Sequence, residues 1–191
     1  PPRLLVSSVA RHPELPLTVK TLAHTTHTWM GESIKVGFRY PKPFWRGQNA
    51  SGTIFSHRGP IIEMYDHSDV SASTYALKGF LNPGLHALSK EERKALAVRQ
   101  LEGYYGSQAA DYLSYEEVVW RDEACTRLPG GKDLAPHQNN GNPAFRQSYM
   151  DGKLLMAGSE TASGYPGYME GAVRSALRVY RTLSGTAAPS Q

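Results

Sequence analysis

The stretch Met156-Ala-Gly-Ser-Glu-Thr-Ala-Ser-Gly-Tyr-Pro-Gly-Tyr-Met-Glu-Gly-Ala172 decides the fold of this chain. Residues 154–158, which run into its start, are typical of a short buried strand, and a helix is predicted after it. Glycines ahead of a helix N-terminus let a flat or anionic ligand approach backbone amides at the positive end of the helix dipole. The same pattern also suits a tight packing turn between helix and sheet, so the residues leave both interpretations open. The apolar residues that share one side of the predicted helix are Val173, Ala176, Leu177, Tyr180 and Leu183.

Earlier in the chain, apolar and polar residues alternate over 34–40. A period of two predicts a strand with one buried face, which places Lys35 on the other face. β-rich runs follow at residues 52–56, 61–65 and 73–81, separated by turn-forming residues. These runs predict an antiparallel sheet of three or four strands, and residues 115–120 predict a further strand.

A helix is predicted from Ser89, because Ser89 and Glu92 form a capping box. Its expected apolar face carries Ala95, Val98, Leu101 and Tyr105, and it is expected to end at Gly103 or Gly106. Residues 121–150 are rich in Pro, Gly and Asn. A long irregular segment inside a compact domain is usually functional.

Composition limits the classes of protein to which the chain can belong. Its 191 residues are 40% hydrophobic, which is enough for an ordinary core. The net charge is +4, but acidic and basic residues are interspersed and the basic ones form no stripe, so we expect no nucleic-acid partner. No run of about 18 apolar residues predicts a membrane span. The single cysteine, Cys125, excludes a disulfide within the chain and fits a reducing compartment, so we expect a cytoplasmic protein.

Two histidines three residues apart, His24 and His27, lack nearby cysteines or carboxylates at ligand spacing, so we expect no metal site. The chain opens at Pro1 with neither an initiator methionine nor a signal peptide pattern. We therefore expect it to be a piece of a longer protein.

Two blocks of the sequence resemble a known family. Gly158-Ser-Glu-Thr-Ala162, followed by Gly167-Tyr-Met-Glu-Gly-Ala172, is similar to the C-terminal signature of the flavin-dependent monoamine oxidases. Met30-Gly-Glu-Ser-Ile-Lys35, followed by Pro43-Phe-Trp-Arg46, is similar to the lysine strand of that family. The resemblance is collinear from residue 1 to about residue 183 and covers only the C-terminal part of such an enzyme. The nucleotide-binding G-x-G-x-x-G fingerprint of the family does not occur in the chain.

This resemblance implies an α+β fold, in which an antiparallel substrate-domain sheet with a helix precedes the C-terminal strand–turn–helix of a Rossmann-like, GR2-type FAD-binding domain. Residues 1–20 would be the end of an FAD-domain segment and a connector. Residues 21–119 would be part of the substrate domain, and residues 120–191 the C-terminal part of the FAD domain. A missing N-terminal FAD-domain segment or subunit is implied as a partner, and a homo-oligomer is left open.

The resemblance also implies site residues. Lys35 matches the lysine that hydrogen-bonds a water near flavin N5, and Tyr168 matches a tyrosine of the aromatic cage that flanks the amine. Trp120 matches a tryptophan beside the isoalloxazine ring. The residues that fall where the family contacts the rest of the flavin are Gly158, Ser159, Glu160, Thr161, Gly167 and Met169. From the residues alone, Lys35 is a solvated strand lysine, and Tyr168 and Trp120 are core aromatics.

Two departures from the family pattern matter. Cys125 lies near the cysteine that bonds covalently to the flavin in the animal enzymes, but its spacings to Trp120 and Gly158 differ from theirs. We therefore expect FAD to be bound non-covalently. Thr126 stands where the second cage tyrosine would be, so the second wall must come from elsewhere, with Tyr165 as the candidate.

The activity implied by the resemblance is oxidation of an amine C–N bond to an imine, with O2 reduced to hydrogen peroxide. Amino-acid and polyamine oxidases of the same superfamily are the alternative. They usually carry a histidine after the glutamate of this turn, whereas Thr161 follows Glu160 here, which favours simple amines. A hypothesis of a different class is a non-catalytic module that only completes a flavin site.

Overall fold

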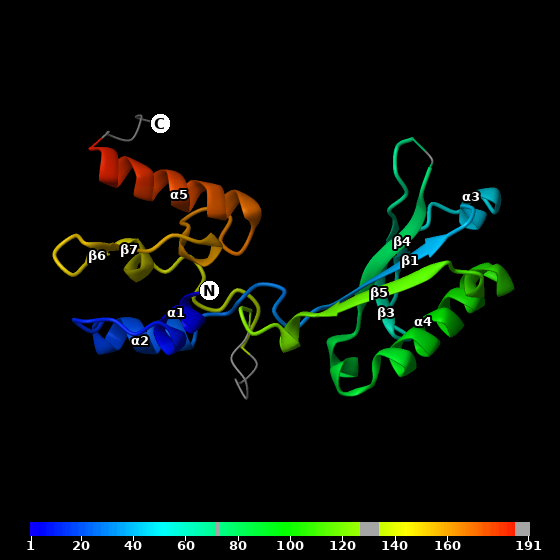
Figure 1. Cartoon of the computed structure of the whole chain (residues 1–191), viewed down its shortest axis with the longest axis horizontal. Coiled ribbons are helices and arrows are strands. Elements are labelled where there is room, and N and C mark those ends of the chain that lie inside the picture. The colour runs from blue at the N-terminus through cyan, green and yellow to red at the C-terminus, as the bar shows by residue number, and fades with distance from the viewer. Residues whose placement is uncertain (72, 127–133, 186–191) are drawn as a thin grey trace. The chain divides into compact units, whose positions relative to one another are not determined.

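The computed structural model describes residues 1–71, 73–126 and 134–185 (Figure 1). They form two compact units, one of Pro1–Gly31 with Ala124–Gln191 and one of Glu32–Glu123. The sequence-based division placed its boundaries after residues 20 and 119. In the structure, the chain passes from the first unit to the second after Gly31 and returns to the first after Glu123. Trp120 therefore lies in the second unit.

The second unit contains a five-stranded antiparallel sheet, which confirms the predicted α+β class and the antiparallel pairing. The strand predicted at 115–120 is part of this sheet and pairs with the central strand, so the sheet is one strand wider than the first four runs indicated. In spatial order the strands are β2 (Ile54–Phe55), β3 (Ile61–Asp66), β4 (Tyr75–Leu81), β1 (Ile34–Tyr40) and β5 (Ser114–Val119).

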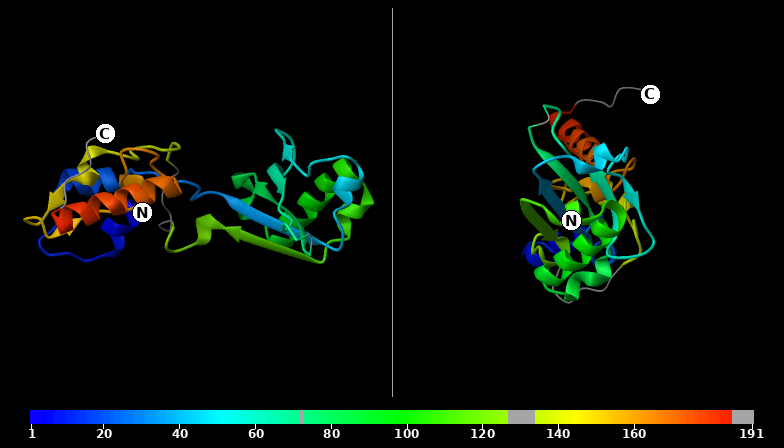
Figure 2. Two further views of the ribbon diagram at one scale, coloured as in Figure 1. Left: turned by 90° about the horizontal axis from the view of Figure 1, so that it is seen from above. Right: turned by 90° about the vertical axis from the view of Figure 1, so that its right-hand side faces the viewer.

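The alternation in β1 is confirmed, because its apolar side chains are buried while Lys35 and Arg39 are exposed. The buried face packs against α4 (Lys90–Tyr105), which lies beside the sheet in Figures 1 and 2. Both hydrogen bonds of the capping box between Ser89 and Glu92 are present.

The buried face of α4 differs from the predicted one. Ala95 is exposed, and the buried residues follow a spacing of four: Arg93, Ala97, Leu101 and Tyr105. An arginine is tolerated on this face because its Nη2 lies 2.5 Å from Oε1 of Glu117 on β5. Gly103 lies inside the helix, and Gly106, at φ 80°, ends it.

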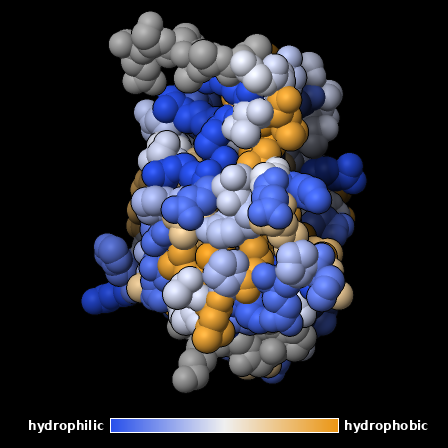
Figure 3. All heavy atoms as spheres, turned by 90° about the vertical axis from the view of Figure 1, so that its left-hand side faces the viewer, coloured by the Kyte–Doolittle hydropathy of each residue, from blue (hydrophilic) through white to orange (hydrophobic). Residues whose placement is uncertain are grey.

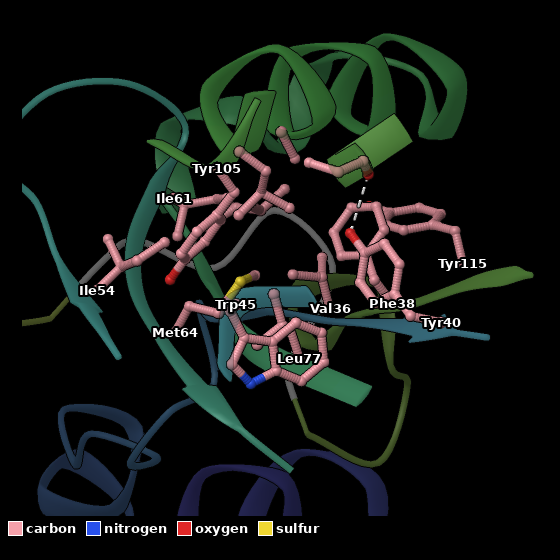
Figure 4. Packing of buried hydrophobic residues seen from close by; sticks show 14 of the residues in the cluster. Val36, Phe38, Tyr40, Trp45, Ile54, Ile61, Met64, Leu77, Tyr105 and Tyr115 are labelled. Atoms are coloured by element: carbon pink, nitrogen blue, oxygen red, sulfur yellow. Dashed lines mark hydrogen bonds between the residues drawn. The ribbon is translucent and has the colours of Figure 1, made fainter. Parts of the chain in front are cut away.

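Aromatic side chains fill the core between α4 and the sheet (Figure 4). The Trp45 ring is fully buried, and its Nε1 donates to Oδ2 of Asp66 at 2.8 Å. The Tyr40 hydroxyl donates to the Ala109 carbonyl at 3.0 Å. Burial raises the pKa of Tyr40 well above its ordinary value. The short helices around this core are α3 (Phe44–Gly47), η1 (Pro83–Ala87), η2 (Ser107–Ala110) and η3 (Trp120–Asp122).

The regular elements of the first unit are mainly helices, and the unit has its own smaller core. The buried apolar residues of this core are Leu15, Val19, Ala23, Phe145 and Met156. The strand predicted at 154–158 is only two residues long, because it pairs solely with one short neighbour in a hairpin. The elements are α1 (Pro2–Ser8), α2 (Leu17–His24), η4 (Pro143–Arg146), β6 (Ser148–Tyr149), β7 (Leu154–Leu155), η5 (Ser159–Thr161) and α5 (Met169–Ser184).

Helix α5 packs on its unit through small residues and leaves its apolar side at the surface. Gly171 and Ser175 are buried, whereas Val173, Leu177 and Tyr180 are 46–65% exposed. Apolar side chains reach the surface in patches in Figure 3, which shows one face of the molecule. Within the described residues, no helix is both long and apolar enough to cross a membrane.

Candidate functional site

The turn between β7 and α5 is fixed by hydrogen bonds at both ends. The Gly158 amide donates to Oγ of Ser175 at 2.9 Å, which ties the start of the turn to α5. The Gly167 amide donates to the Ser159 carbonyl at 3.1 Å and closes the turn on itself. Both glycines have positive φ, 139° and 87°, a conformation that favours glycine. We call residues 158–168 the glycine turn.

The glycine turn leads into a helix N-terminus that no side chain caps among the described residues. Tyr168 is the N-cap of α5, and within the described part of the chain no hydrogen bond from its own side chain caps the helix. The first-turn amides are therefore left for solvent or a ligand. The Tyr168 side chain is 47% exposed and that of Met169 is 89% exposed, so this end of the helix is accessible within its own unit.

The side chains predicted to contact the flavin divide into two groups. Glu160 and Thr161 are buried, and the Thr161 hydroxyl donates to the Gly158 carbonyl at 2.9 Å. The Ser159 hydroxyl donates to Oε2 of Glu160 at 3.0 Å. These side chains hold the turn in shape, while Tyr168 and Met169 are exposed.

Tyr168 belongs to a stack of three rings, which we call the aromatic stack: Trp29, His137 and Tyr168. The centroids of Trp29 and His137 are 4.2 Å apart with an interplanar angle of 21°. Those of His137 and Tyr168 are 5.6 Å apart with an angle of 26°. Sequence reasoning missed Trp29 and His137. The available signal was Trp29, directly before the Met30-Gly block, whereas nothing local to His137 indicated it.

The loop that carries His137 is fastened to the segment after α2. The His137 amide donates to Nδ1 of His27 at 3.2 Å, and the His27 amide donates to the Gln138 carbonyl at 2.9 Å. Nδ2 of Asn139 donates to the Thr25 carbonyl at 3.0 Å. The Gly141 amide donates to the carbonyl of Glu160 at 2.7 Å, which joins the same loop to the glycine turn. His27 thus has a structural contact here, where the sequence offered only a weak metal motif.

Tyr165, the candidate for a second cage wall, has a different partner. The Arg174 guanidinium lies 4.8 Å from the centre of the Tyr165 ring, and Arg174 Nε donates to Oε1 of Glu170 at 2.7 Å. Among the described residues, the ring contacts of Tyr168 are with Trp29 and His137.

Lys35 lies in the second unit, on the face of the sheet opposite α4. Its neighbours across the sheet are Phe80 on β4 and Val118 on β5. Gly37, two residues along β1, has no atom of the described residues within 4 Å of the place where a Cβ would stand. A hollow of about 370 Å³ opens there, and the charged residues on this face that line it are Lys35, Arg39, Lys78 and Glu116.

The remaining two predicted positions are near the end of β5. Trp120 begins η3, and its ring is 38% exposed, so it is not a fully buried core residue. The Trp120 amide donates to the Ser33 carbonyl at 3.0 Å. Cys125 is a free, exposed thiol.

Comparisons with known proteins agree with one another. The family model for flavin-containing amine oxidoreductases matches residues 7–181. The flavin-containing amine oxidase B of Rattus norvegicus is 31% identical in an alignment 193 residues long, which covers 95% of this chain and 36% of that protein. The chain thus spans about a third of the length of such relatives.

Two solved structures share the fold. Wild-type putrescine oxidase bound to putrescine matches with a TM-score of 0.78 and 27% identity, over 98% of this chain and 41% of that one. Cyclohexylamine oxidase from Brevibacterium oxydans matches with a TM-score of 0.77 and 26% identity, over 95% of this chain and 40% of that one. The glycine turn and the Lys35 strand both lie inside the matched residues, and the chain belongs to the flavin-containing amine oxidoreductase family.

Proposed function

We propose that this chain is the C-terminal part of an FAD-dependent amine oxidase. The reaction is R–CH2–NH2 + O2 → R–CH=NH + H2O2, after which water hydrolyses the imine to an aldehyde and ammonia. Bound flavin would supply the redox chemistry: it would take a hydride equivalent, which carries both electrons, together with one proton from the amine, and pass two electrons and two protons to O2. The observation that carries this proposal is the exposed, uncapped start of α5 behind the glycine turn, in a chain of this family.

The residues present fit a flavin. The first-turn amides of α5 present the positive end of the helix dipole, which suits the negative charge that a reduced flavin ring carries. Gly158 and Gly167 have positive φ and so give the turn the shape that leads into the exposed start of α5, where a flat ligand would meet the first-turn amides. Main-chain groups of the glycine turn and the side chains of Tyr168 and Met169 would hold the cofactor, while Glu160 and Thr161 support them from inside.

Tyr168 would bind the amine. An aromatic face attracts and orients an amine through the ring quadrupole, and a packed ring excludes water from the reacting carbon. Lys35 would hold a water at flavin N5 and assist the reaction with O2. The FAD would be bound non-covalently, because the spacings of Cys125 in the sequence differ from those of the enzymes with a covalent flavin.

The apolar side of α5 supports the proposal of a further FAD-domain segment. Val173, Leu177 and Tyr180 form an exposed row on a helix whose other side is packed. The relatives are almost three times as long as this chain, and the fingerprint that binds the pyrophosphate is not among its residues. We expect the N-terminal part of the FAD domain to cover this row, as part of the same polypeptide or as a separate subunit.

Diamine oxidation is the second candidate, and the likeness in fold to putrescine oxidase favours it. Assays with a simple monoamine and with putrescine separate the two. Bleaching of the flavin by putrescine but not by the monoamine would support the second candidate.

The charge at the start of α5 gives the sharpest test. In the complete protein, Met169→Glu places a negative charge beside the proposed flavin, while Met169→Gln is a neutral control of similar size. Met169 is 89% exposed, so neither change removes packing, and the glutamate by itself should stabilise the start of α5 by about 0.3–1 kcal/mol. We expect Met169→Glu to weaken FAD binding about 5-fold and to make the flavin harder to reduce, since one charge at a helix terminus contributes about 1 kcal/mol. A protein without flavin absorption, or equal FAD affinity in the two variants, would refute the proposal.

A further inference from the structure

The aromatic stack lies directly against the backbone that precedes Tyr168. A Cβ added at Gly167 would stand 3.1 Å from Cβ of Trp29 and 3.5 Å from Nδ1 of His137. Trp29 and His137 therefore contact both the ring of Tyr168 and the peptide before it. Because the Tyr168 side chain is half exposed, few other contacts in its own unit restrict the orientation of its ring.

His137 is held in an uncommon conformation. Its φ is 60°, a left-handed value that costs a side chain with a Cβ about 1–2 kcal/mol. The hydrogen bonds from the loop to Thr25 and His27 offset this cost. Backbone strain that the surrounding contacts maintain is often found at functional sites, and here it places an imidazole 5.6 Å from the Tyr168 ring at an interplanar angle of 26°.

Trp29 supports His137 from a second direction. Its ring stacks on the imidazole and also lies 5.6 Å from the Tyr168 ring at an angle of 45°. The three rings come from the segment after α2, from the loop at 134–142 and from the end of the glycine turn, so they depend on the folded unit.

We propose that His137 is a positioning residue for Tyr168: its imidazole, backed by Trp29, fixes the plane of the tyrosine ring that receives the amine. This inference rests on the proposed function, because it assigns the free face of Tyr168 to the substrate. Among the residues that the structure describes, the ring contact of Tyr165 is with Arg174 and not with the aromatic stack.

The proposal predicts which half of the reaction changes when the stack is lost. A tilted Tyr168 ring would still leave the glycine turn and the first-turn amides of α5 in place, so FAD binding and reoxidation by O2 should be retained. Transfer from the amine depends on the orientation of the reacting carbon, and a misplacement of about 1 Å can slow such a step up to about 100-fold.

The test uses the complete flavin-loaded enzyme and two substitutions at one position. His137→Asn removes the ring, and asparagine tolerates a left-handed φ. His137→Phe keeps a flat ring in the same place, at a higher backbone cost than asparagine at this left-handed φ, so its FAD content is measured first. Stopped-flow mixing with amine under anaerobic conditions measures flavin reduction, and mixing of the reduced enzyme with O2 measures reoxidation.

We expect His137→Asn to slow flavin reduction about 10- to 100-fold at saturating amine, with reoxidation and FAD content unchanged. We expect His137→Phe to stay within about 3-fold of the wild type, because the ring plane is retained. In NMR spectra, the Tyr168 ring resonances should shift when the imidazole is removed and return toward wild type in His137→Phe.

The outcomes separate the two proposals. Flavin that no amine reduces, in the wild type as well, overturns the proposed function. Wild-type reduction in His137→Asn, or equal slowing in His137→Phe, overturns the positioning role of His137. If His137→Asn does not retain FAD, Trp29→Leu decides, because it removes the support but leaves the imidazole. In Trp29→Leu, a slowing of flavin reduction smaller than that expected for His137→Asn, with reoxidation unchanged, then supports the proposal. An unchanged rate of flavin reduction in Trp29→Leu overturns it.

Discussion

Replacing Gly171 with alanine tests whether the glycine turn depends on close packing against α5. Gly171 is the third residue of the helix and is buried. A Cβ built at this position would lie 2.2 Å from the carbonyl oxygen of Tyr165 and 3.3 Å from Cβ of Ala162. The first contact is with backbone, so relief requires the turn itself to move, and a side-chain rotation does not suffice.

Two opposing effects determine the sign of the change in stability. Alanine is favoured over glycine inside a helix by about 1 kcal/mol. An extra methyl group in a packed site costs about 1–3 kcal/mol, and more when backbone must shift. The contact at 2.2 Å places Gly171→Ala at the upper end of that range, so we expect a net loss of about 1–2 kcal/mol.

Gly103→Ala is the matched control. Gly103 also lies inside a helix, α4, but in the described part of the chain no atom beyond the helix's own backbone stands within 4 Å of its added Cβ. Only the helix propensity acts there, so we expect Gly103→Ala to stabilise α4 by about 1 kcal/mol.

Amide hydrogen exchange measured by peptide separates the two units. We expect protection in residues 158–184 to fall about 5- to 30-fold in Gly171→Ala, and protection in α4 to rise about 5-fold in Gly103→Ala. FAD affinity should fall in the first variant and stay constant in the second. Equal or higher protection of residues 158–184 in Gly171→Ala would refute the idea that this contact fixes the turn.

Three further predictions concern the buried ion pair, the strand lysine and the free thiol. Arg93→Met leaves Glu117 buried without its cation and should cost about 3–5 kcal/mol in urea unfolding, much of which the double variant with Glu117→Leu should recover. Burial opposes the charge of Glu117, but the hydrogen bonds from Arg93 and Tyr115 outweigh it and lower the pKa of Glu117. A lowered folded-state pKa stabilises the fold above the ordinary carboxylate pKa of about 4.3, so the urea midpoint should drop more steeply below that pH in the wild type than in Glu117→Gln. Lys35→Met, at an exposed position, should change stability little yet slow flavin reoxidation by about one to three orders of magnitude in stopped-flow, and a wild-type rate would return Lys35 to a solvated strand lysine. Acid denaturation should release free FAD into the supernatant, and flavin that stays with the pellet unless Cys125 is replaced by alanine would show covalent attachment.

Sequence alone predicted the features that depend on residues close together in the chain. The alternation over 34–40 gave the correct strand and the correct exposed face for Lys35. The capping box at Ser89 gave the correct start of α4. The paired glycine motifs predicted both the turn before α5 and the family. Each of these signals acts within a few residues, where backbone geometry and side-chain periodicity leave few alternatives.

Tertiary structure decided which surfaces are covered. Periodicity placed Ala95 on the inner face of α4, yet Arg93 and Ala97 are the residues buried there. Arg93 can be buried because Glu117 on β5 neutralises its charge. Periodicity likewise identified the apolar side of α5, yet the packed side carries Gly171 and Ser175, because only small residues fit against the glycine turn.

Tertiary structure also assembled the aromatic stack. Trp29, His137 and Tyr168 are far apart in the sequence, and no local pattern links them. The hydrogen bonds between the loop and the segment at 25–27 bring them together, and the glycine at 167 allows the rings to approach the backbone. Sequence thus determined where the turn, the strand and the helices form, while contacts between distant segments determined which side chains meet, because such contacts exist only once the chain has folded.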